Sequence, residues 1–311
     1  MKATKTYSAP SSFTSYEKND VYEVITNRII QMIEEGVNPW KKTWENVDSD
    51  FSGPVNFISG RPYTGINFFV LSCSPYSFPY FMTMKQVNEK GGRVKAGEKA
   101  TPVVFAKSFE KKSTKETADG EKVITQKGFC YKLHWVFNIE QTNLPLPEIK
   151  EGIENENLII EQCENVIVAY KNAPAITHVS NSAYYSPSID TVNMPKMHQF
   201  INSSAYYATL FHELIHSTGS AKRLGRDGVV DFDKFGSERY SNEELIAELG
   251  AAFLNAFTGI TNPNLEENTA AYLTGWLKPL KNDKKFVFKA AAAAQKAVNY
   301  MLGKQEKEQE E

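Results

Sequence analysis

Two histidines separated by three residues, with a glutamate directly after the first, have the spacing of a metal site. Residues 212–216 are His-Glu-Leu-Ile-His, so His212 and His216 lie four positions apart. On an α-helix this spacing puts both imidazoles on one face, where they can bind the same metal ion. Glu213 then lies beside the metal as a general base toward water. The pattern predicts a metal-dependent hydrolase that binds one Zn²⁺ per chain.

The flanking sequence predicts that this motif lies on a largely buried helix over residues 203–217. Serines at its start suit a helix cap, and Thr218 with Gly219 suits its end. An apolar stripe runs through Tyr207, Leu210, Phe211, Leu214 and Ile215. Buried imidazoles need polar partners, which leaves an alternative in which both histidines are ordinary hydrogen-bonded core residues.

A zinc ion held by two histidines needs a third protein ligand, and a second predicted helix over residues 241–257 carries candidate carboxylates. Ser241 or Asn242 is expected to cap it. Glu244 and Glu248 lie four apart and therefore share a face, and Glu248 is surrounded by apolar residues where a carboxylate needs a cation or hydrogen bonds. Glu243 and Glu244 also suit the first turn of a helix, where acids complement the helix dipole.

This arrangement resembles the gluzincin metallopeptidases, in which a glutamate is the third ligand and an acid four residues later orients a ligand histidine. The resemblance implies that Glu244 is the ligand and Glu248 the orienting acid. In this chain the second acid is Glu rather than Asp, and the gap from His216 is long, so Glu248 stays open as the alternative ligand.

Longer stretches around these motifs are similar to the ArdC antirestriction family of mobile elements. In the C-terminal half the likeness lies in residues 206–219, 223–226 and 243–251, and in the N-terminal half in 38–44, 61–67 and 92–99. It implies an N-terminal domain that binds single-stranded DNA and a C-terminal zincin-like metallopeptidase domain. The implied role is antirestriction, which protects a plasmid or conjugative element in a new host.

Length and composition agree with an α+β protein of two domains, since 311 residues exceed what one core usually organises. We expect a disordered N-terminus at 1–15, a DNA-binding domain at 16–141, a linker at 142–152, a metallopeptidase domain at 153–303 and a charged tail at 304–311. Cys73, Cys130 and Cys163 are scattered, which suits free thiols in a reducing compartment. No apolar run is long enough to span a membrane, so we expect a cytoplasmic protein.

Charge is distributed unevenly along the chain. Residues 1–150 carry a net charge of +4 and residues 151–311 a net charge of −6. Aromatic and basic residues alternate in the N-terminal half, a composition that suits base stacking and phosphate contacts on single-stranded DNA. The candidate DNA-binding residues are Trp40, Lys41, Trp44, Arg61, Tyr63, Lys95, Lys99 and Lys107, with further rings at Phe105, Tyr131 and Trp135 and further lysines at Lys42 and Lys132.

Periodicity predicts the remaining elements. In the N-terminal half we expect helices at 21–35, 66–73 and 83–90, and paired strands at 101–109 and 122–137 joined by a charged loop at 110–121. In the C-terminal half we expect a helix at 154–171, short strands at 176–179, 183–186 and 191–194 with a hairpin between the last two, and a final helix at 282–302.

Two other functions remain possible from the sequence alone. One is a binding protein that shields DNA or occludes a nuclease, with a structural or relict metal site whose fourth ligand is His198 or His178. The other is a metal-dependent nuclease, which a helix with two histidines matches poorly. For a peptidase, the partner is a protein substrate or a host restriction enzyme, and the residue that stabilises the oxyanion is one of Tyr184, Tyr185, His198 and Tyr240.

Overall fold

The computed structural model describes residues 20–35, 53–117, 120–148, 156–230, 238–260 and 275–304. The N-terminal half has three helices and a four-stranded sheet of order β1-β2-β4-β3. Its helices are α1 (Val21–Glu34), α2 (Gly65–Ser72) and α3 (Met84–Glu89). Its strands are β1 (Val55–Asn56), β2 (Tyr80–Thr83), β3 (Thr101–Thr117) and β4 (Gly120–Asn138). All three helices lie where the sequence predicted them.

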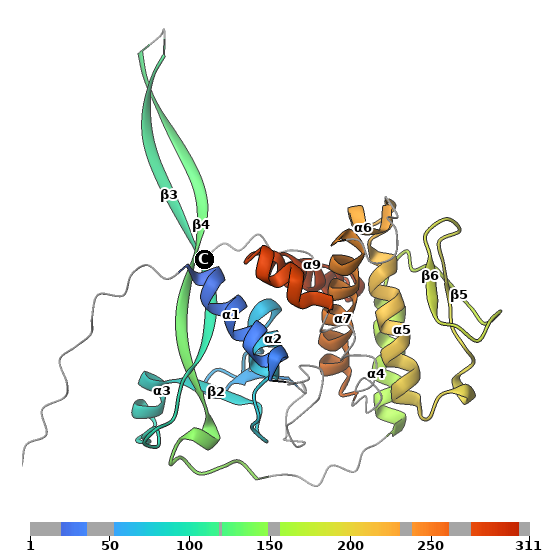
Figure 1. Cartoon of the computed structure of the whole chain (residues 1–311), viewed down its shortest axis with the longest axis horizontal. Helices are drawn as coiled ribbons and strands as arrows, with labels where there is room; N and C mark the ends of the chain where they lie inside the picture. Colours follow the sequence, from blue (N-terminus) through green and yellow to red (C-terminus); the bar gives the residue numbers. More distant parts are fainter. Residues whose placement is uncertain are drawn as a thin grey trace, which may run out of the picture.

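Strands β3 and β4 form a long two-stranded ribbon that projects from the body of the molecule (Figure 1). Antiparallel pairing continues from Thr101 opposite Val136 to Thr117 opposite Gly120. The predicted charged loop at 110–121 is therefore wrong, because residues 110–117 belong to β3 and residues 120 and 121 to β4. Apolar alternation marks only the part of a strand that faces a core, whereas the backbone pairing extends beyond that part.

In the C-terminal half, helices pack together beside a small sheet of order β5-β7-β6 (Figure 1). The principal helices are α4 (Glu156–Ala169), α5 (Ser203–Thr218), α7 (Glu238–Thr258) and α9 (Phe286–Met301). The strands are β5 (Ala175–Thr177), β6 (Tyr184–Ser186) and β7 (Thr191–Asn193). As predicted, β6 and β7 are antiparallel neighbours, and only the short helix η2 (Met197–Gln199) separates them from α5 in the chain. Shorter elements of this half are the single-turn helices η2 and α6 (Asp227–Val230), and a further one, η1 (Ile139–Gln141), follows β4 in the N-terminal half.

One helix cap and two helix boundaries differ from the predictions. Asn202, rather than a serine, caps α5 by accepting a hydrogen bond from the backbone of Ala205 at 2.8 Å. Helix α7 begins at Glu238, so Ser241 and Asn242 lie inside it and cannot cap it. The final helix, predicted at 282–302, begins only at Phe286, because residue 282 ends a separate helical segment over 275–282 that the sequence did not predict.

One hydrophobic core joins the two halves. Ile25 and Ile29 of α1 and Phe68 of α2 belong to the same cluster of buried residues as Phe253 of α7 and Phe288 of α9. Phe68 and Phe253 meet edge to face with ring centroids 4.8 Å apart. Burial of this apolar surface from both halves stabilises their mutual arrangement.

The N-terminal unit extends beyond the predicted boundary at residue 141. Thr142 is 3% exposed and forms a β-bridge with Val94, and Leu144 packs against the small cluster around Val87 and Ile139. The start of the predicted linker is therefore part of the N-terminal fold, and residues 149–155 lie outside the described residues. Among the residues described, no helix combines the length and hydropathy needed to cross a membrane.

Candidate metal centre and nucleic-acid interface

The two histidines of α5 point their Nε2 atoms at each other. These atoms are 3.1 Å apart, and two nitrogens bound to one zinc at about 2.0–2.1 Å each are separated by about 3.3 Å in tetrahedral geometry. Nδ1 of His216 lies 3.2 Å from an oxygen of Glu243, and Nδ1 of His212 lies 3.5 Å from an oxygen of Glu248. A carboxylate beside Nδ1 keeps the proton there, so both Nε2 lone pairs face the same point. This arrangement favours a cation between them.

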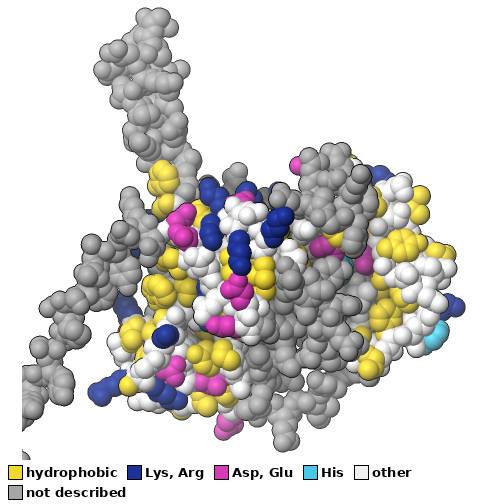
Figure 2. Space-filling view, viewed as in Figure 1, with side chains coloured by type: hydrophobic (Ala, Val, Ile, Leu, Met, Phe, Trp, Pro, Cys, Tyr) yellow, Lys and Arg dark blue, Asp and Glu magenta, His cyan; other side chains and the backbone are white. Residues whose placement is uncertain are grey.

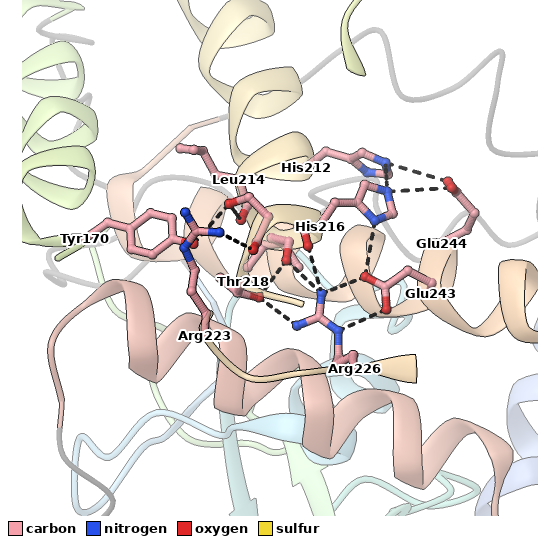
Figure 3. A network of polar contacts seen from close by, with 11 residues as sticks. Tyr170, His212, Leu214, His216, Thr218, Arg223, Arg226, Glu243 and Glu244 are labelled. Carbon is pink, nitrogen blue, oxygen red and sulfur yellow. Dashed lines mark hydrogen bonds and ion pairs between the residues drawn. The ribbon is translucent and has the colours of Figure 1, made fainter. Parts of the chain in front are cut away.

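Glu244 completes the group from the neighbouring helix. Its carboxylate oxygens lie 3.6 Å from Nε2 of His216 and 3.7 Å from Nε2 of His212 (Figure 3). Among the described residues, His212, His216 and Glu244 are the set whose ligand atoms come together, all within 4.8 Å of one another. Two imidazole nitrogens and one carboxylate oxygen form a donor set that fits zinc.

A close approach of α5 and α7 brings these residues together. Gly250 lies on α7 where an added Cβ would come within 2.7 Å of Cδ1 of Ile215 on α5. A larger residue at this position would push the helices apart. The missing side chain thus lets the carboxylates of α7 reach the imidazoles of α5.

Glu243 is held in turn by Arg226. Two nitrogens of the Arg226 guanidinium donate to the two oxygens of Glu243 at 2.9 and 2.6 Å (Figure 3). The same guanidinium donates to Oγ1 of Thr218 at 2.6 Å and to the carbonyl oxygen of Ile215 at 2.8 Å, which satisfies the end of α5. A bidentate arginine fixes a carboxylate in both position and orientation. Arg226 therefore positions Glu243, which orients His216.

The electrostatics of the site favour positive charge. Burial by itself disfavours a protonated His212, but the hydrogen bond to Glu244 and the charges of Glu248 and Glu213 outweigh burial and raise the pKa of His212 to about 10. Burial also opposes ionisation of Glu243, yet its contacts with Arg226 and His216 leave the pKa of that carboxyl lowered. For Glu248 burial dominates, and its pKa is raised.

The metal-ligand group opens into a cleft of about 330 Å³. Glu213 lines this cleft beside the two histidines. Of the four residues considered for stabilising an oxyanion, Tyr184, Tyr185 and Tyr240 line the cleft, whereas His198 is exposed on η2 and is not part of the lining. Tyr185 donates its hydroxyl hydrogen to Asp190 at 2.9 Å, and Tyr240 hydrogen-bonds Glu244.

The two histidines considered as fourth ligands lie elsewhere. Nδ1 of His178 is 2.9 Å from the carbonyl oxygen of Met194, and within the described ranges neither His178 nor His198 joins the group of ligand atoms. Three protein ligands and an adjoining cleft leave room for a fourth ligand from solvent or substrate.

An ion pair ties the β6–β7 hairpin to the end of α5. Two nitrogens of Arg223, whose side chain is 2% exposed, donate to the oxygens of Asp190 at 2.8 and 3.1 Å. Arg223 also donates to the backbone carbonyl oxygens of Ser217 and Asn172. The hairpin carries Tyr184 and Tyr185, so this pair fixes one wall of the cleft.

The candidate DNA-binding residues are spread over different environments. Arg61, Lys95, Lys99 and Lys107 are exposed. Tyr63 is not, because its ring is 6% exposed in a core cluster with Phe81, and the ring is therefore unavailable for stacking on a base. Trp40, Lys41 and Trp44 lie outside the described residues.

The ribbon carries exposed rings next to lysines. Phe105 and Phe109 are 47% and 46% exposed. Lys107 lies two residues from each of them along β3, so the three side chains lie on one face. Lys132 pairs opposite Phe105 and is exposed on the same face. We call these four residues the ribbon face. Tyr131 and Trp135 are also exposed, at 41% and 47%, but they point to the other side.

Sequence reasoning missed several features of both sites. Glu243 was expected to complement a helix dipole, but it contacts His216, and no role was predicted for Arg226. The separation of 17 residues between Arg226 and Glu243 gives no local pattern that would connect them. Phe109 was not among the DNA-binding candidates, although its spacing of two residues from Lys107 on one strand was a local signal that could have found it.

Two family models match the chain. Residues 161–293 match a zincin-like metallopeptidase, and residues 19–137 match the N-terminal domain of the anti-restriction factor ArdC. These matches confirm the predicted α+β fold with two domains, of which the C-terminal one is zincin-like.

Solved structures and curated relatives agree with this assignment. A crystal structure of the antirestriction ArdC protein from plasmid R388, without metal, is 34% identical with a TM-score of 0.67 and covers 92% of this chain and 97% of that one. Its Mn(II)-bound structure is 33% identical with a TM-score of 0.65, covering 93% and 100%. The uncharacterized protein y4eC of Sinorhizobium fredii is 30% identical and covers 94% of both chains.

The protein belongs to the ArdC antirestriction family. It is also similar to two Escherichia coli proteins named DNA primase TraC, at 35% and 33% identity over 94% of this chain. The chain spans only 20% and 28% of their lengths.

Proposed function

We propose that this protein is an antirestriction factor of a mobile element that combines a zinc-dependent peptidase-like site with a surface for single-stranded DNA. The observation that carries the proposal is the group of His212, His216 and Glu244 at a cleft lined by Glu213. We assign metal binding to the half that follows residue 155 and DNA binding to the half that ends before 149, with the protein acting in the cytoplasm.

His212, His216 and Glu244 would hold the ion, and a bound Zn²⁺ supplies Lewis acidity at that position. Glu213 takes a proton from water in the cleft and passes it to the leaving amine of a peptide bond. Glu243 and Glu248 keep the Nδ1 protons of the two histidines in place, so that their Nε2 atoms remain free for the ion.

The substrate proposed for this site is a protein, with a host restriction enzyme as the candidate. The short strand β6 contributes Tyr184 and Tyr185 to the cleft. Strand β7 pairs with one edge of β6. A peptide can add to the other edge of β6 by backbone hydrogen bonds.

For DNA, the proposal rests on the ribbon face. Its two phenylalanine rings offer stacking surfaces to bases, and its two lysines can contact phosphates between them. Neither contact depends on base identity, so we propose binding with little sequence preference. The exposed residues Arg61, Lys95 and Lys99 extend the positive charge of this half, and relatives that bear the name DNA primase are consistent with DNA as a partner.

The test is the transfer of an unmodified plasmid into a restricting host that produces the protein. We expect wild type to raise transfer, and Glu213→Gln to lose this effect while it keeps one zinc per chain by metal analysis. Glu161→Gln, at an exposed position on α4, is the matched control and should behave as wild type. Full protection by Glu213→Gln would contradict a catalytic role and favour a protein that only shields DNA.

A further inference from the structure

Five lysines lie within twelve residues of the C-terminal half, which otherwise carries negative charge. Lys278 and Lys281 are exposed on the helical segment 275–282, Lys284 and Lys285 lie in the turn that follows, and Lys289 is exposed in the first turns of α9. Figure 2 shows basic side chains gathered over this part of the molecule, beside α1 and below the ribbon. We call these five residues the lysine face.

The lysine face is joined to the base of the ribbon by three aromatic rings. Tyr22 of α1, Tyr131 of β4 and Phe288 of α9 pack on one another with centroid distances between 4.8 and 5.8 Å. Nζ of Lys285 lies over the Tyr22 ring, 5.1 Å from its centroid. Tyr131 is still 41% exposed, so a ring and an ammonium group are available side by side where the two halves meet.

Part of this charge is paired with acids at the surface. Nζ of Lys281 lies 2.7 Å from Glu34, and Nζ of Lys289 lies 2.9 Å from Asp283. Both lysines are more than half exposed, and ion pairs of this kind contribute little stability. Phosphate groups can therefore replace the acids as partners. These two acids leave a net charge of +3 on the five lysines.

We propose that a single strand of DNA bound to the ribbon face passes around the ribbon at β4, from Lys132 to its chain neighbour Tyr131 on the opposite side, and continues onto the lysine face. Both halves of the chain then form one nucleic-acid interface. The inference rests on the proposed DNA binding and adds a role in it for the half that holds the metal site. Ammonium groups beside an exposed ring suit a flexible, unpaired strand, whose bases are free to stack on Tyr131.

The first test measures salt dependence of binding with the full-length chain and a labelled oligonucleotide, by fluorescence anisotropy. Lys285→Ala/Lys289→Ala removes two proposed phosphate contacts. Log K falls as log salt rises, and this dependence should become less steep by about 1.4 in the variant, since each contact on a single strand contributes about 0.7. Lys171→Ala/Lys196→Ala removes the same charge at exposed positions that flank the β5-β7-β6 sheet. That sheet lies on the opposite side of the molecule from the ribbon (Figure 1), so this control should keep the slope.

A second variant should strengthen DNA binding instead of weakening it. Glu34→Gln/Asp283→Asn frees Lys281 and Lys289 from their acids. The Asp283 side chain also accepts a hydrogen bond from the backbone of Lys285 at 2.8 Å, and the amide oxygen of the substituted side chain can still accept it. We expect tighter binding and a steeper slope, which loss of folding cannot produce.

The outcomes separate this inference from the proposal on which it rests. Binding by wild type together with equal slopes for the lysine-face variant and its control would overturn the shared interface and leave DNA binding by the ribbon intact. No binding by folded wild type would overturn both. A lower slope for the lysine-face variant alone supports the shared interface.

Discussion

The candidate metal centre and the ribbon hold the side chains proposed for function in opposite environments. At the metal centre the imidazoles and carboxylates are largely buried, and each has a fixed partner, such as Glu243 between His216 and Arg226. On the ribbon, Phe105 and Phe109 are nearly half exposed, and the proposed contact with DNA is distributed over several neighbours on the same face.

This difference determines how each region responds to a substitution. Removal of one partner from a buried polar network leaves the others unsatisfied in a place that water cannot reach, so the cost is large. Removal of one residue from an exposed face costs one contact among several. Four predictions, from the largest effect to the smallest, test whether the two regions differ in this way.

The largest effect is expected at the histidines. His212→Ala or His216→Ala should abolish stable zinc binding, because two remaining ligands do not form a complete site. Glu213→Gln should keep the metal and lower any peptidase activity by about 10²- to 10⁴-fold, the contribution of a general base. Metal analysis of the purified variants measures the first effect. Loss of zinc from Glu213→Gln would contradict its role as a base.

The acids around the histidines come next. Glu244→Gln should weaken zinc binding more than Glu248→Gln or Glu243→Gln, each of which is expected to cost about 10- to 100-fold as a residue that orients a ligand. Arg226→Ala should weaken zinc binding through its effect on Glu243. In the presence of Glu243→Gln, the further loss of zinc affinity from Arg226→Ala should therefore be small. Competition with a zinc chelator gives the affinities. A larger loss of zinc affinity for Glu248→Gln than for Glu244→Gln would mean that Glu248 is the ligand and Glu244 the orienting acid.

The ribbon face should give smaller effects. Phe105→Ala should cost about 1–3 kcal/mol of binding to single-stranded DNA with an unchanged salt slope, as expected for one stacked base. Lys107→Ala should reduce the slope by about 0.7. Tyr63→Phe serves as the control because its ring is buried, and it should bind DNA as wild type does. Complete loss of DNA binding in Phe105→Ala would contradict the comparison, because the exposed ribbon would then respond to one substitution as strongly as the buried metal centre.

An effect of similar size is expected at the wall of the cleft, where it should depend on pH. Burial alone would raise the pKa of Asp190, but hydrogen bonds from Arg223 and Tyr185 outweigh it and leave that pKa lowered. A lowered pKa in the folded state means stability that is present above the unfolded value of about 3.9 and is lost as pH falls through the folded value. Asp190→Asn should therefore lower stability by about 1–3 kcal/mol at pH 7, with the difference from wild type shrinking below pH 4 in thermal unfolding. A difference that does not change with pH would mean that the charge of Asp190 is not what stabilises the hairpin.

The sequence by itself determined the helix of the metal site and its two histidines, because a spacing of four residues on a helix fixes which side chains share a face. Glu244 was among its candidates for the same reason. Helices α1 to α3 also followed from local patterns of apolar residues and caps.

Tertiary structure decided what depends on contacts between distant segments. The approach of α5 and α7 at Gly250 selected Glu243 as the partner of His216, and a loop 17 residues earlier supplied Arg226. The register of β3 and β4 placed Phe105 and Lys132 side by side, and the shared core buried Tyr63 but left Tyr131 exposed beside Lys285. Sequence spacing encodes neighbours only within one helix or strand, whereas packing between elements sets which faces meet and which remain in water.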